Sequence, residues 1–489
     1  MAEVLTPSAE LAGRHRWFAD VPVAHHSSLE PRTEPVNYSM TILEEHHAHL
    51  SELIFGIAGC EGAAFLRCGI SHTPHETRFL VRSVEAVRAE EYLVREPLRL
   101  SIASTAYARV AKRADGDGEG IIFVHSHPTG IVRFSPQDDR EEPKLMRFLQ
   151  SRLGVDVPVG SLVISSRPSH CGRVWVDGGW EPMSVMRVIG QRFKFLGLDP
   201  ATDPLPQFFD RQIRAFGEDV QRVLRHLRVG IVGVGGTGSA MVEQLARLGV
   251  GALYVFDGDT FDSTNVNRVY GSRADDANRK KTDIQRDSIE RIDLGTEVAV
   301  VPIHITKREA ALRLRECDVV FGCTDKERPR GILTALVTRY LMPVIDMGVI
   351  VLSKQQQLDG VFGRVTTLLP GESCLFCRGR ISPEHIAAEG LYPELRNRLF
   401  EEGYAPELED NAPAVIPFTT AVAAQAVTEL LHRLTGFMGL DRVSSEVLLF
   451  MHSSEIRTNR IPRNPDCVCA DRRLWGRGDE REYLGLMWS

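Results

Sequence analysis

No stretch of this 489-residue chain approaches the ~18 uninterrupted apolar residues that a membrane-spanning helix needs. The most apolar helix-like run, residues 414–431, is interrupted by Pro417, Gln425 and Glu429. The first residues also lack a basic stretch followed by an apolar core, which a secretory signal requires. We therefore expect a cytoplasmic protein without membrane segments.

An excess of charge of one sign is lacking as well. The formal net charge is -7 at pH 7, with 25% charged and 43% hydrophobic residues, a balance that argues against broad nucleic-acid or membrane-surface binding. Cysteine is sparse, and an odd number, nine, without a secretory signal indicates reduced thiols rather than a disulfide framework. The length is enough for two or three domains.

The first part of the chain predicts one compact domain after a lead-in. Residues 1–36 are rich in Pro, His and Glu without periodicity, which predicts a poorly ordered segment or a docking arm. A helical period over 42–55 and strand-like runs predict an α+β domain over 37–197. The strand-like runs are 63–68, 78–84, 120–124, 161–164 and 173–176. Three prolines mark residues 198–209 as a linker.

The second part, residues 210–475, has a different pattern and is followed by a tail over 476–489. Strand-like segments alternate with helical ones such as 239–248, which predicts an α/β domain with a mainly parallel, doubly wound, Rossmann-like sheet. The strand-like segments are 228–232, 253–257, 297–301, 318–321 and 343–346.

Two histidines and a carboxylate in the first domain have spacings that suit a zinc ion. His125 and His127 are two residues apart in an extended segment, so both rings can face one ion, and Asp138 follows eleven residues after His127. Three protein ligands leave the fourth zinc position open for a water of lowered pKa. Hydrolysis also needs a base and an oxyanion donor, and Ser135 is close enough in sequence to be the donor. The alternative is that both histidines are structural and Asp138 caps a helix.

This His-x-His-Pro segment, with Ser135 and Asp138 at these offsets, resembles the JAB/MPN metalloisopeptidases, which carry the JAMM motif. The resemblance implies an enzyme that removes ubiquitin-like proteins from lysines or trims their C-termini. It also implies a glutamate base on a strand after the first helix. Glu61 occupies that place, with Glu52 and Glu76 as the alternatives.

A glycine-rich turn opens the second domain. It lies between a predicted strand and a predicted helix, so its N–H groups and the helix N-terminus can hold phosphates. Asp257, at the end of the next strand, would bind ribose. By themselves these residues fit NAD as well as ATP. The glycines are Gly233, Gly235, Gly236 and Gly238.

Cations after the second strand favour ATP. Arg268 and the segment Arg279-Lys280-Lys281 would neutralise a triphosphate during attack on its α-phosphate, whereas an NAD dehydrogenase does not need them. Asp325, after a later strand, is a suitable oxygen ligand for the accompanying Mg²⁺.

The segment from about 205 to 470 resembles the ThiF/MoeB-type adenylyltransferases, which include the ubiquitin-activating enzymes; the likeness begins at Asp210-Arg211-Gln212. The resemblance implies that Asn265, Arg268 and Lys281 contact ATP phosphates and that Asp325 binds the metal. It also implies a homodimer in which Arg211 reaches the partner's active site. The activated group would be the C-terminal carboxylate of a small protein that ends in Gly-Gly.

Two further cysteine features refine this expectation. Cys374, Cys377, Cys467 and Cys469 form two close pairs, and four thiolates predict a closed structural zinc site, with a metal-free thiol cluster as the alternative. Many relatives form a thioester on a cysteine after the CxxC motif, but residues 378–413 contain no cysteine. The enzyme then stops at the adenylate, uses another thiol, or passes the activated carboxylate to a separate protein.

Together, the two domains predict a bifunctional enzyme of a prokaryotic ubiquitin-like pathway that trims a ubiquitin-like protein and adenylates the exposed glycine. Possible partners are a conjugating enzyme or a sulfurtransferase, and a role in antiviral defence rests on analogy alone. One alternative is activation of a sulfur carrier for thiamine, molybdopterin or cysteine synthesis. The other is a scaffold that only binds a ubiquitin-like protein.

Overall fold

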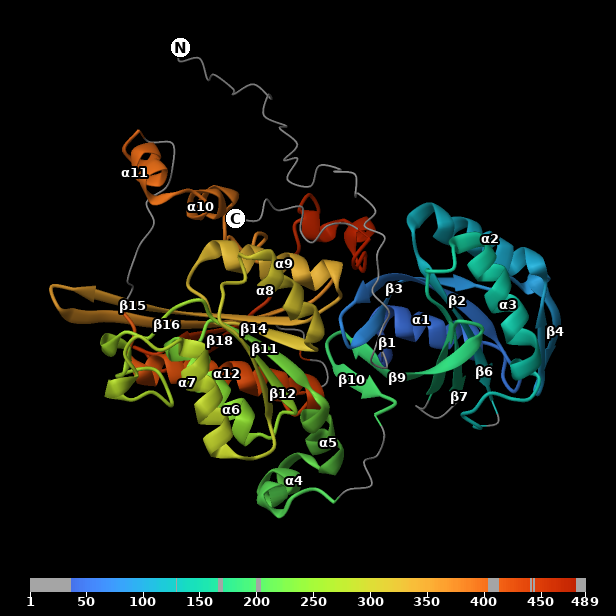
Figure 1. The fold of residues 1–489 in the computed structure, drawn as a ribbon, viewed down its shortest axis with the longest axis horizontal. Helices are drawn as coiled ribbons and strands as arrows, with labels where there is room; N and C mark the ends of the chain where they lie inside the picture. The colour runs from blue at the N-terminus through green and yellow to red at the C-terminus, as the bar shows by residue number, and fades with distance from the viewer. Residues whose placement is uncertain are drawn as a thin grey trace, which may run out of the picture.

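The computed structural model describes residues 37–128, 130–165, 170–198, 204–402, 413–439, 442 and 445–480. The expected lead-in over 1–36, residues 199–203 of the linker and the last nine residues of the tail lie outside the described residues. Two eight-stranded sheets organise the chain, one in the N-terminal half and one in the C-terminal half (Figure 1). In the part that is described, no helix is long and apolar enough to cross a membrane.

The N-terminal sheet closes on itself. Its strand order is β1-β3-β2-β6-β7-β8-β9-β10, and β1 also pairs in parallel with β9. The elements are β1 Asn37–Leu43, α1 Glu44–Phe55, β2 Ala63–His72, β3 Glu76–Ala86, β4 Tyr92–Glu96, β5 Arg99–Ile102, α2 Ser104–Asp117, β6 Gly120–His127, α3 Asp138–Leu153, β7 Val159–Ser165, β8 His170–Val176, β9 Gly179–Ile189 and β10 Phe193–Leu196.

Helices cover both faces of this sheet. Leu50 and Ile54 of α1 belong to a core cluster with Ile122 and Val124 of β6. The other face carries α2 and α3, which pack in a second cluster against the remaining alternate residues of β6 and β2. The core therefore lies in two layers, and β6 runs between them.

The helix expected over 42–55 begins two residues later, because Ile42 and Leu43 belong to β1. Six of the seven β1 residues are buried, since the strand pairs with both β3 and β9. The sequence of β1 alternates polar and apolar residues, and only its last two residues, Ile42 and Leu43, extend into the helical pattern that follows.

The C-terminal sheet has the order β13-β12-β11-β14-β15-β16-β17-β18. Its first five strands in this order are parallel, and β16, β17 and β18 continue it in antiparallel fashion. The elements are α4 Asp210–Phe216, α5 Glu218–His226, β11 Arg228–Val232, α6 Gly236–Arg247, β12 Ala252–Phe256, α7 Lys281–Ile292, β13 Glu297–Val301, α8 Arg308–Arg313, β14 Val319–Gly322, α9 Glu327–Arg339, β15 Val344–Lys354, β16 Gln357–Leu368, α10 Pro383–Glu389, α11 Pro393–Glu401, α12 Ile416–Thr435, β17 Glu446–Phe450 and β18 Glu455–Asn459.

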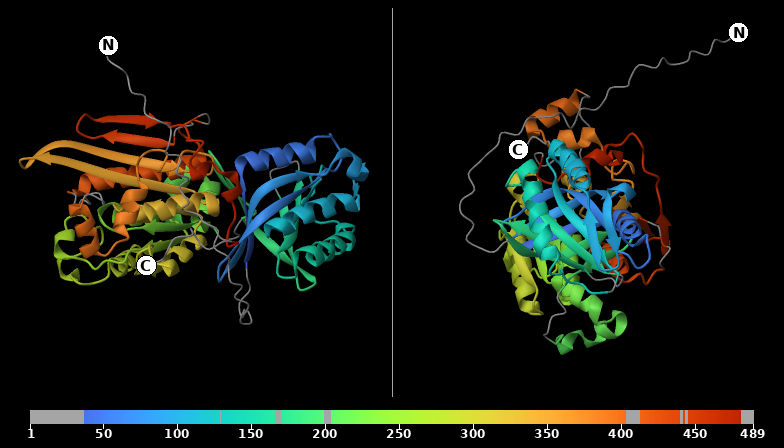
Figure 2. Two further views of the ribbon diagram at one scale, coloured as in Figure 1. Left: turned by 90° about the horizontal axis from the view of Figure 1, so that it is seen from above. Right: turned by 90° about the vertical axis from the view of Figure 1, so that its right-hand side faces the viewer.

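Helices again cover both faces, with α6 and α12 on one and α8 and α9 on the other. The strands expected over 228–232 and 297–301 have those bounds in the structure. The expected helix 239–248 begins earlier, at Gly236, since the glycine turn leads directly into α6. The strand expected to end at 346 runs on to Lys354 and forms with β16 a long hairpin that projects from the domain (Figure 2).

The two halves pack against each other through apolar and charged contacts. Leu43 and Leu80 of the first half share a core cluster with helices of the second, and Ile189 and Phe193 share another. The residues after the last cysteines also return to the first sheet, where Gly478 forms a parallel bridge with Ile70. The described part of the expected tail, residues 476–480, is therefore held between the domains.

Candidate metal and nucleotide sites

Strand β6 places both histidines of the motif on the face covered by α2 and α3. Successive residues of a strand point to opposite faces, so His125 and His127 lie on one side while Ser126 points to the other. There the Ser126 hydroxyl donates to the Ile54 carbonyl at 2.9 Å and accepts from the Gly62 N–H. The strand is buried throughout, so the imidazoles have fixed positions.

Helix α3 brings Asp138 to these histidines. The His125 Nε2 lies 3.2 Å from the His127 Nε2 and 3.5 Å from the Asp138 Oδ1. Each of the three residues offers one ligand atom, and these three atoms lie within 4.8 Å of one another, which suits a single metal ion. Two imidazoles and a carboxylate are a donor set that binds zinc. The sequence-predicted cluster is therefore assembled in the structure.

The start of α3 is fixed by reciprocal hydrogen bonds. The Ser135 N–H donates to the Asp138 Oδ2 at 2.6 Å, and the Asp138 N–H donates to the Ser135 Oγ at 3.2 Å. Burial opposes ionisation of Asp138, but its contacts with His125 and Ser135 outweigh burial and hold its pKa below the usual value. Asp138 thus holds the segment before α3 through Ser135 and faces the histidines as an anion.

Glu61 lies beside this cluster, directly before β2. Its N–H donates to the Glu96 carbonyl and its own carbonyl accepts from Arg95, both at 3.0 Å, so the β4–β5 hairpin holds its backbone. Burial raises the pKa of Glu61 to about 7, opposed by the charge of His125 and reinforced by that of Asp138. A carboxyl group with this pKa can exchange protons near neutral pH.

Neither alternative glutamate contacts the cluster. The Glu52 side chain is 79% exposed on α1 and faces His49. Glu76 is buried at the junction between the two halves, where it pairs with arginines.

The glycine turn joins β11 to α6 as expected. Gly233 has a φ of +86°, and a Cβ on Gly238 would lie 1.8 Å from the Gly233 carbonyl oxygen, so both positions need glycine. The Asp257 carboxylate fixes the loops around this turn, because it accepts from the N–H groups of Val234 and Asp259 at 2.8 and 2.9 Å. Gly235, by contrast, has open space around its Cα.

Two of the predicted phosphate-binding side chains, Arg268 and Lys281, are held by contacts with residues that follow β12. Arg268 donates to the Thr264 carbonyl at 2.9 Å and to the Asn265 amide oxygen at 3.4 Å, and its side chain passes close to Gly236. Lys281 begins α7, and its Nζ lies 2.7 Å from the Asp259 carboxylate.

Two further predicted residues are exposed. Asp325 is in the loop between β14 and α9. Arg211 is on α4, and in the described residues of a single chain it reaches no nucleotide site.

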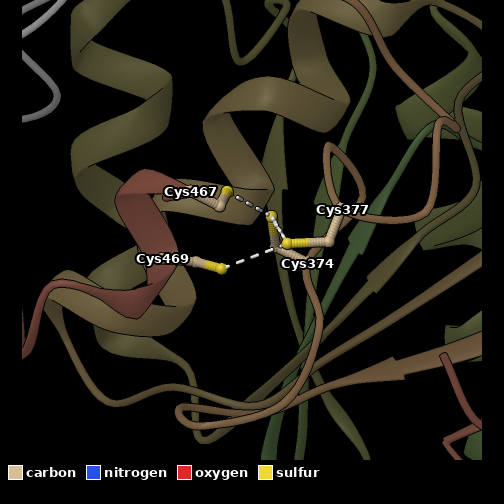
Figure 3. A group of neighbouring side chains, drawn as sticks. All are labelled: Cys374, Cys377, Cys467 and Cys469. Carbon is tan, nitrogen blue, oxygen red and sulfur yellow. Dashed lines mark hydrogen bonds between the residues drawn. The ribbon is translucent and has the colours of Figure 1, made fainter. Parts of the chain in front are cut away.

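The four paired cysteines meet in the C-terminal half (Figure 3). Sulfur–sulfur distances are 3.7 Å for Cys374–Cys377, 3.6 Å for Cys374–Cys467 and 3.5 Å for Cys377–Cys469. Zinc–sulfur bonds of about 2.3 Å in a tetrahedron give edges of about 3.8 Å. The cluster is therefore close to the geometry of a four-thiolate zinc site, even though the second pair is a CxC.

The segment without cysteine forms α10 and α11, with residues 403–412 outside the described residues. Glu389 of α10 accepts from the N–H groups of Glu327 and Arg328, which fastens α10 to the first turn of α9 beside Asp325. Cys323 lies nearby against Met347, and burial raises the pKa of its thiol far above the ordinary value. Such a thiol is a poor nucleophile.

Sequence reasoning missed the groups that support the metal cluster. Glu142, one helical turn after Asp138, has a carboxylate oxygen 3.5 Å from the His125 Nδ1. The Ile131 carbonyl lies 3.1 Å from the His127 Nδ1. The i, i+4 spacing of Asp138 and Glu142 was a usable signal for the first, but nothing in the sequence marks a backbone carbonyl.

Several known proteins are similar to about half of this chain. "Protein HesA" of Leptolyngbya boryana is 26% identical over 263 residues, which is 53% of this chain and 83% of that protein. The molybdopterin-synthase adenylyltransferase of Escherichia coli is 28% identical over 266 residues, 53% of this chain and 95% of that protein. Ubiquitin-like modifier-activating enzyme 5 of rice is 24% identical over 287 residues, 55% of this chain and 62% of that protein.

Among solved structures, Escherichia coli MccB with MccA-N7isoASN has a TM-score of 0.44 at 16% identity and covers 54% of this chain and 75% of that chain. Residues 56–176 match the prokaryotic homologs of the JAB domain. Residues 209–469, more than half of the chain, match the ThiF family. The chain therefore belongs to the ThiF family and carries, ahead of its ThiF domain, a domain of the prokaryotic JAB type.

Proposed function

We propose that this chain is a bifunctional enzyme acting on a ubiquitin-like protein. The N-terminal domain hydrolyses the bond after a terminal glycine, and the C-terminal domain adenylates the carboxylate that this hydrolysis exposes. The observation that carries the proposal is the pairing, in one chain, of the Glu61, His125, His127 and Asp138 cluster with the glycine turn of a ThiF domain. Linking the two sites raises the concentration of the first product at the second.

In the peptidase half, His125, His127 and Asp138 would hold a zinc ion. When bound, zinc supplies a polarised water of lowered pKa and neutralises developing negative charge. Glu61 accepts a proton as the water attacks the scissile carbonyl and returns it to the leaving amine, for which a pKa of about 7 is well suited. The Ser135 hydroxyl, beside Asp138, donates to the oxyanion.

In the adenylation half, the Rossmann-like turn from Gly233 to Gly238 binds ATP phosphates at the N-terminus of α6. A carboxylate oxygen of the terminal glycine attacks the α-phosphorus, the bond to the bridging oxygen breaks, and pyrophosphate leaves with an acyl adenylate as the other product. Arg268, Lys281 and Asn265 neutralise or orient the phosphates, Asp257 binds ribose and Asp325 binds Mg²⁺.

After adenylation, the activated glycine either moves to a thiol of this chain or stays as the adenylate until a separate protein takes it up. The absence of a cysteine from residues 378–413 and the raised pKa of Cys323 both favour an enzyme that stops at the adenylate. A separate conjugating enzyme or a sulfurtransferase would then take up the activated glycine. We propose a homodimer, as the likeness to ThiF/MoeB-type adenylyltransferases implies, in which the exposed Arg211 reaches the active site of the partner subunit.

The proposal is tested by intact-protein mass spectrometry of a carrier with residues beyond Gly-Gly, incubated with enzyme, zinc and Mg-ATP. We expect loss of the extension and a gain of the AMP mass. Glu61→Ala should abolish trimming only, and Lys281→Ala should abolish adenylation of a pre-trimmed carrier only. Lys354→Ala, which removes an exposed cation on the β15–β16 hairpin, is the matched control. Binding without either reaction would support the scaffold function instead.

A further inference from the structure

We infer that Glu142 is a positioning residue for His125: it holds the imidazole so that Nε2, and not Nδ1, faces the metal cluster. The inference rests on the proposed metallopeptidase function and deepens it. It adds to the three ligands a carboxylate that touches neither the metal nor the substrate.

The placement of Glu142 follows from α3. Residues four apart on a helix share one face, so Asp138 and Glu142 both point at β6. Asp138 lies on the Nε2 side of the His125 ring, at 3.5 Å, and Glu142 lies on the Nδ1 side, also at 3.5 Å. The two carboxylates therefore flank opposite edges of one imidazole.

The His125 Nδ1 needs such an acceptor. It is buried and makes no conventional hydrogen bond to any described residue, and the Glu142 carboxylate faces it. An unsatisfied buried N–H is costly, so closing this short gap is favourable once the ring turns slightly toward Glu142. A donor at Nδ1 leaves the lone pair at Nε2, which is the nitrogen that a metal ion would take.

The Glu142 carboxylate is itself held in place. The Arg173 guanidinium donates to Oε2 at 2.6 and 3.2 Å, and the Ser161 hydroxyl donates to Oε1 at 2.7 Å. Arg173 is fixed in turn, because its guanidinium lies between the rings of Phe134 and Trp180, 3.6 and 4.0 Å from their centroids. Arg173 contacts Oε2, and Oε1, which accepts from Ser161, is also the oxygen that faces His125.

The second histidine shows the same arrangement with a weaker partner. The His127 Nδ1 lies 3.1 Å from the Ile131 carbonyl, so this ring also presents its Nε2 to the cluster. A carboxylate carries a full negative charge and a carbonyl does not, so His125 becomes the more basic ligand of the pair.

The test measures zinc affinity of the full-length chain by chelator competition, with His125→Ala defining which zinc belongs to the cluster. We expect Glu142→Gln to lower the affinity of the cluster for zinc about 10- to 100-fold. Ser161→Ala removes a neighbouring hydrogen bond to the same carboxylate but keeps its charge, and we expect it to change the affinity less than about threefold. Thermal unfolding of the metal-free variants shows that the fold is intact.

An affinity for Glu142→Gln within threefold of the wild-type value would overturn the inference while leaving the proposed function in place. If the wild-type chain and His125→Ala bind the same amount of zinc, the cluster holds no zinc and the proposed peptidase function fails. Should Glu142→Gln not fold, histidine ¹⁵N NMR of the zinc-loaded wild-type chain decides. Zinc on Nε2 of His125 with a slowly exchanging Nδ1 proton supports the inference, and zinc on Nδ1 overturns it.

Discussion

Arg187 of the first sheet donates through Nε to the Asp318 carboxylate of the second domain over 2.7 Å. Glu76 lies beside them and accepts from both Arg187 and Arg228, at 2.9 and 2.7 Å. The acidic side chains and Arg187 are no more than 5% exposed. The two domains are thus joined by a buried network of opposite charges rather than by the linker alone.

Breaking this network should cost more than breaking a surface ion pair. Asp318→Ala removes one of the two anions that Arg187 and Arg228 share, and loss of one partner from a buried pair costs about 3–5 kcal/mol. The control is Asp210→Ala, whose ion pair with Arg214 is largely exposed and contributes about 0–1 kcal/mol. Urea unfolding measures both. Equal effects would show that the network contributes nothing to domain docking.

The same network predicts how stability depends on pH. Burial opposes ionisation of Glu76, but Arg187, Arg78 and Arg228 outweigh burial and hold its pKa well below the ordinary 4.5. Because the folded pKa lies below the unfolded one, this stabilisation is complete above pH 4.5 and is lost as the pH falls further. Thermal unfolding should show a steep loss of stability below that pH, and a shallower one for Glu76→Gln. Parallel curves would assign the acid sensitivity to other groups.

The two site motifs could be predicted because their members are close in sequence. A strand places His125 and His127 on one face whatever surrounds it, and the φ of Gly233 is dictated by the turn itself. The bounds of the strand expected over 228–232 were confirmed for the same reason, because a short apolar run followed by glycines defines where the strand ends.

Features that depend on distant segments could not be predicted. Strand β1 was not predicted, and its last two residues fell in the helical pattern expected over 42–55, because its pairing with β9 joins residues that are far apart in sequence. The contact of Arg187 with Asp318 spans 131 positions, and neither residue has a local signal for an ion pair. Similarly, the antiparallel part of the second sheet follows from the β15–β16 hairpin, which carries no glycine-rich turn sequence at residues 355–356.

Two glycines of the nucleotide turn should respond differently to alanine. A Cβ on Gly238 would collide with the Gly233 backbone, so Gly238→Ala should disrupt the turn and lower the melting temperature. Gly235 has a φ of -71° and open space around it, so Gly235→Ala should leave the melting temperature unchanged. Its methyl group would nevertheless occupy space where phosphates must approach the backbone.

We therefore expect Gly235→Ala to raise the KM for ATP in pyrophosphate exchange without loss of stability. Peptidase activity, measured on the same preparation, is the internal control and should stay at the wild-type level. If the KM for ATP also stayed at that level, the open face of this turn would not be where phosphates bind.

The four-cysteine cluster should control how firmly the chain's last described segment fastens the two domains. The Trp475 indole N–H donates to the Cys469 carbonyl at 3.1 Å, and Arg82 of the first sheet donates to the Trp475 carbonyl at 2.9 Å. Four residues further on, Asp479 accepts from the His72 N–H at 2.6 Å. A zinc ion at the cysteines would thus act through a short, rigid connection on contacts with the N-terminal domain.

Cys467→Ser should therefore lose one zinc per chain and also loosen residues 475–479 from the first sheet. A local destabilisation of about 1.4 kcal/mol would speed amide hydrogen exchange there about tenfold. Cys171→Ser, which removes a thiol that belongs to no cluster, is the control and should change neither zinc content nor exchange. Loss of zinc with unchanged hydrogen exchange at residues 475–479 would mean that the cluster stabilises only the ThiF domain. The contacts of these residues with the first sheet would then depend on the hydrogen bonds of Arg82 and Asp479 alone.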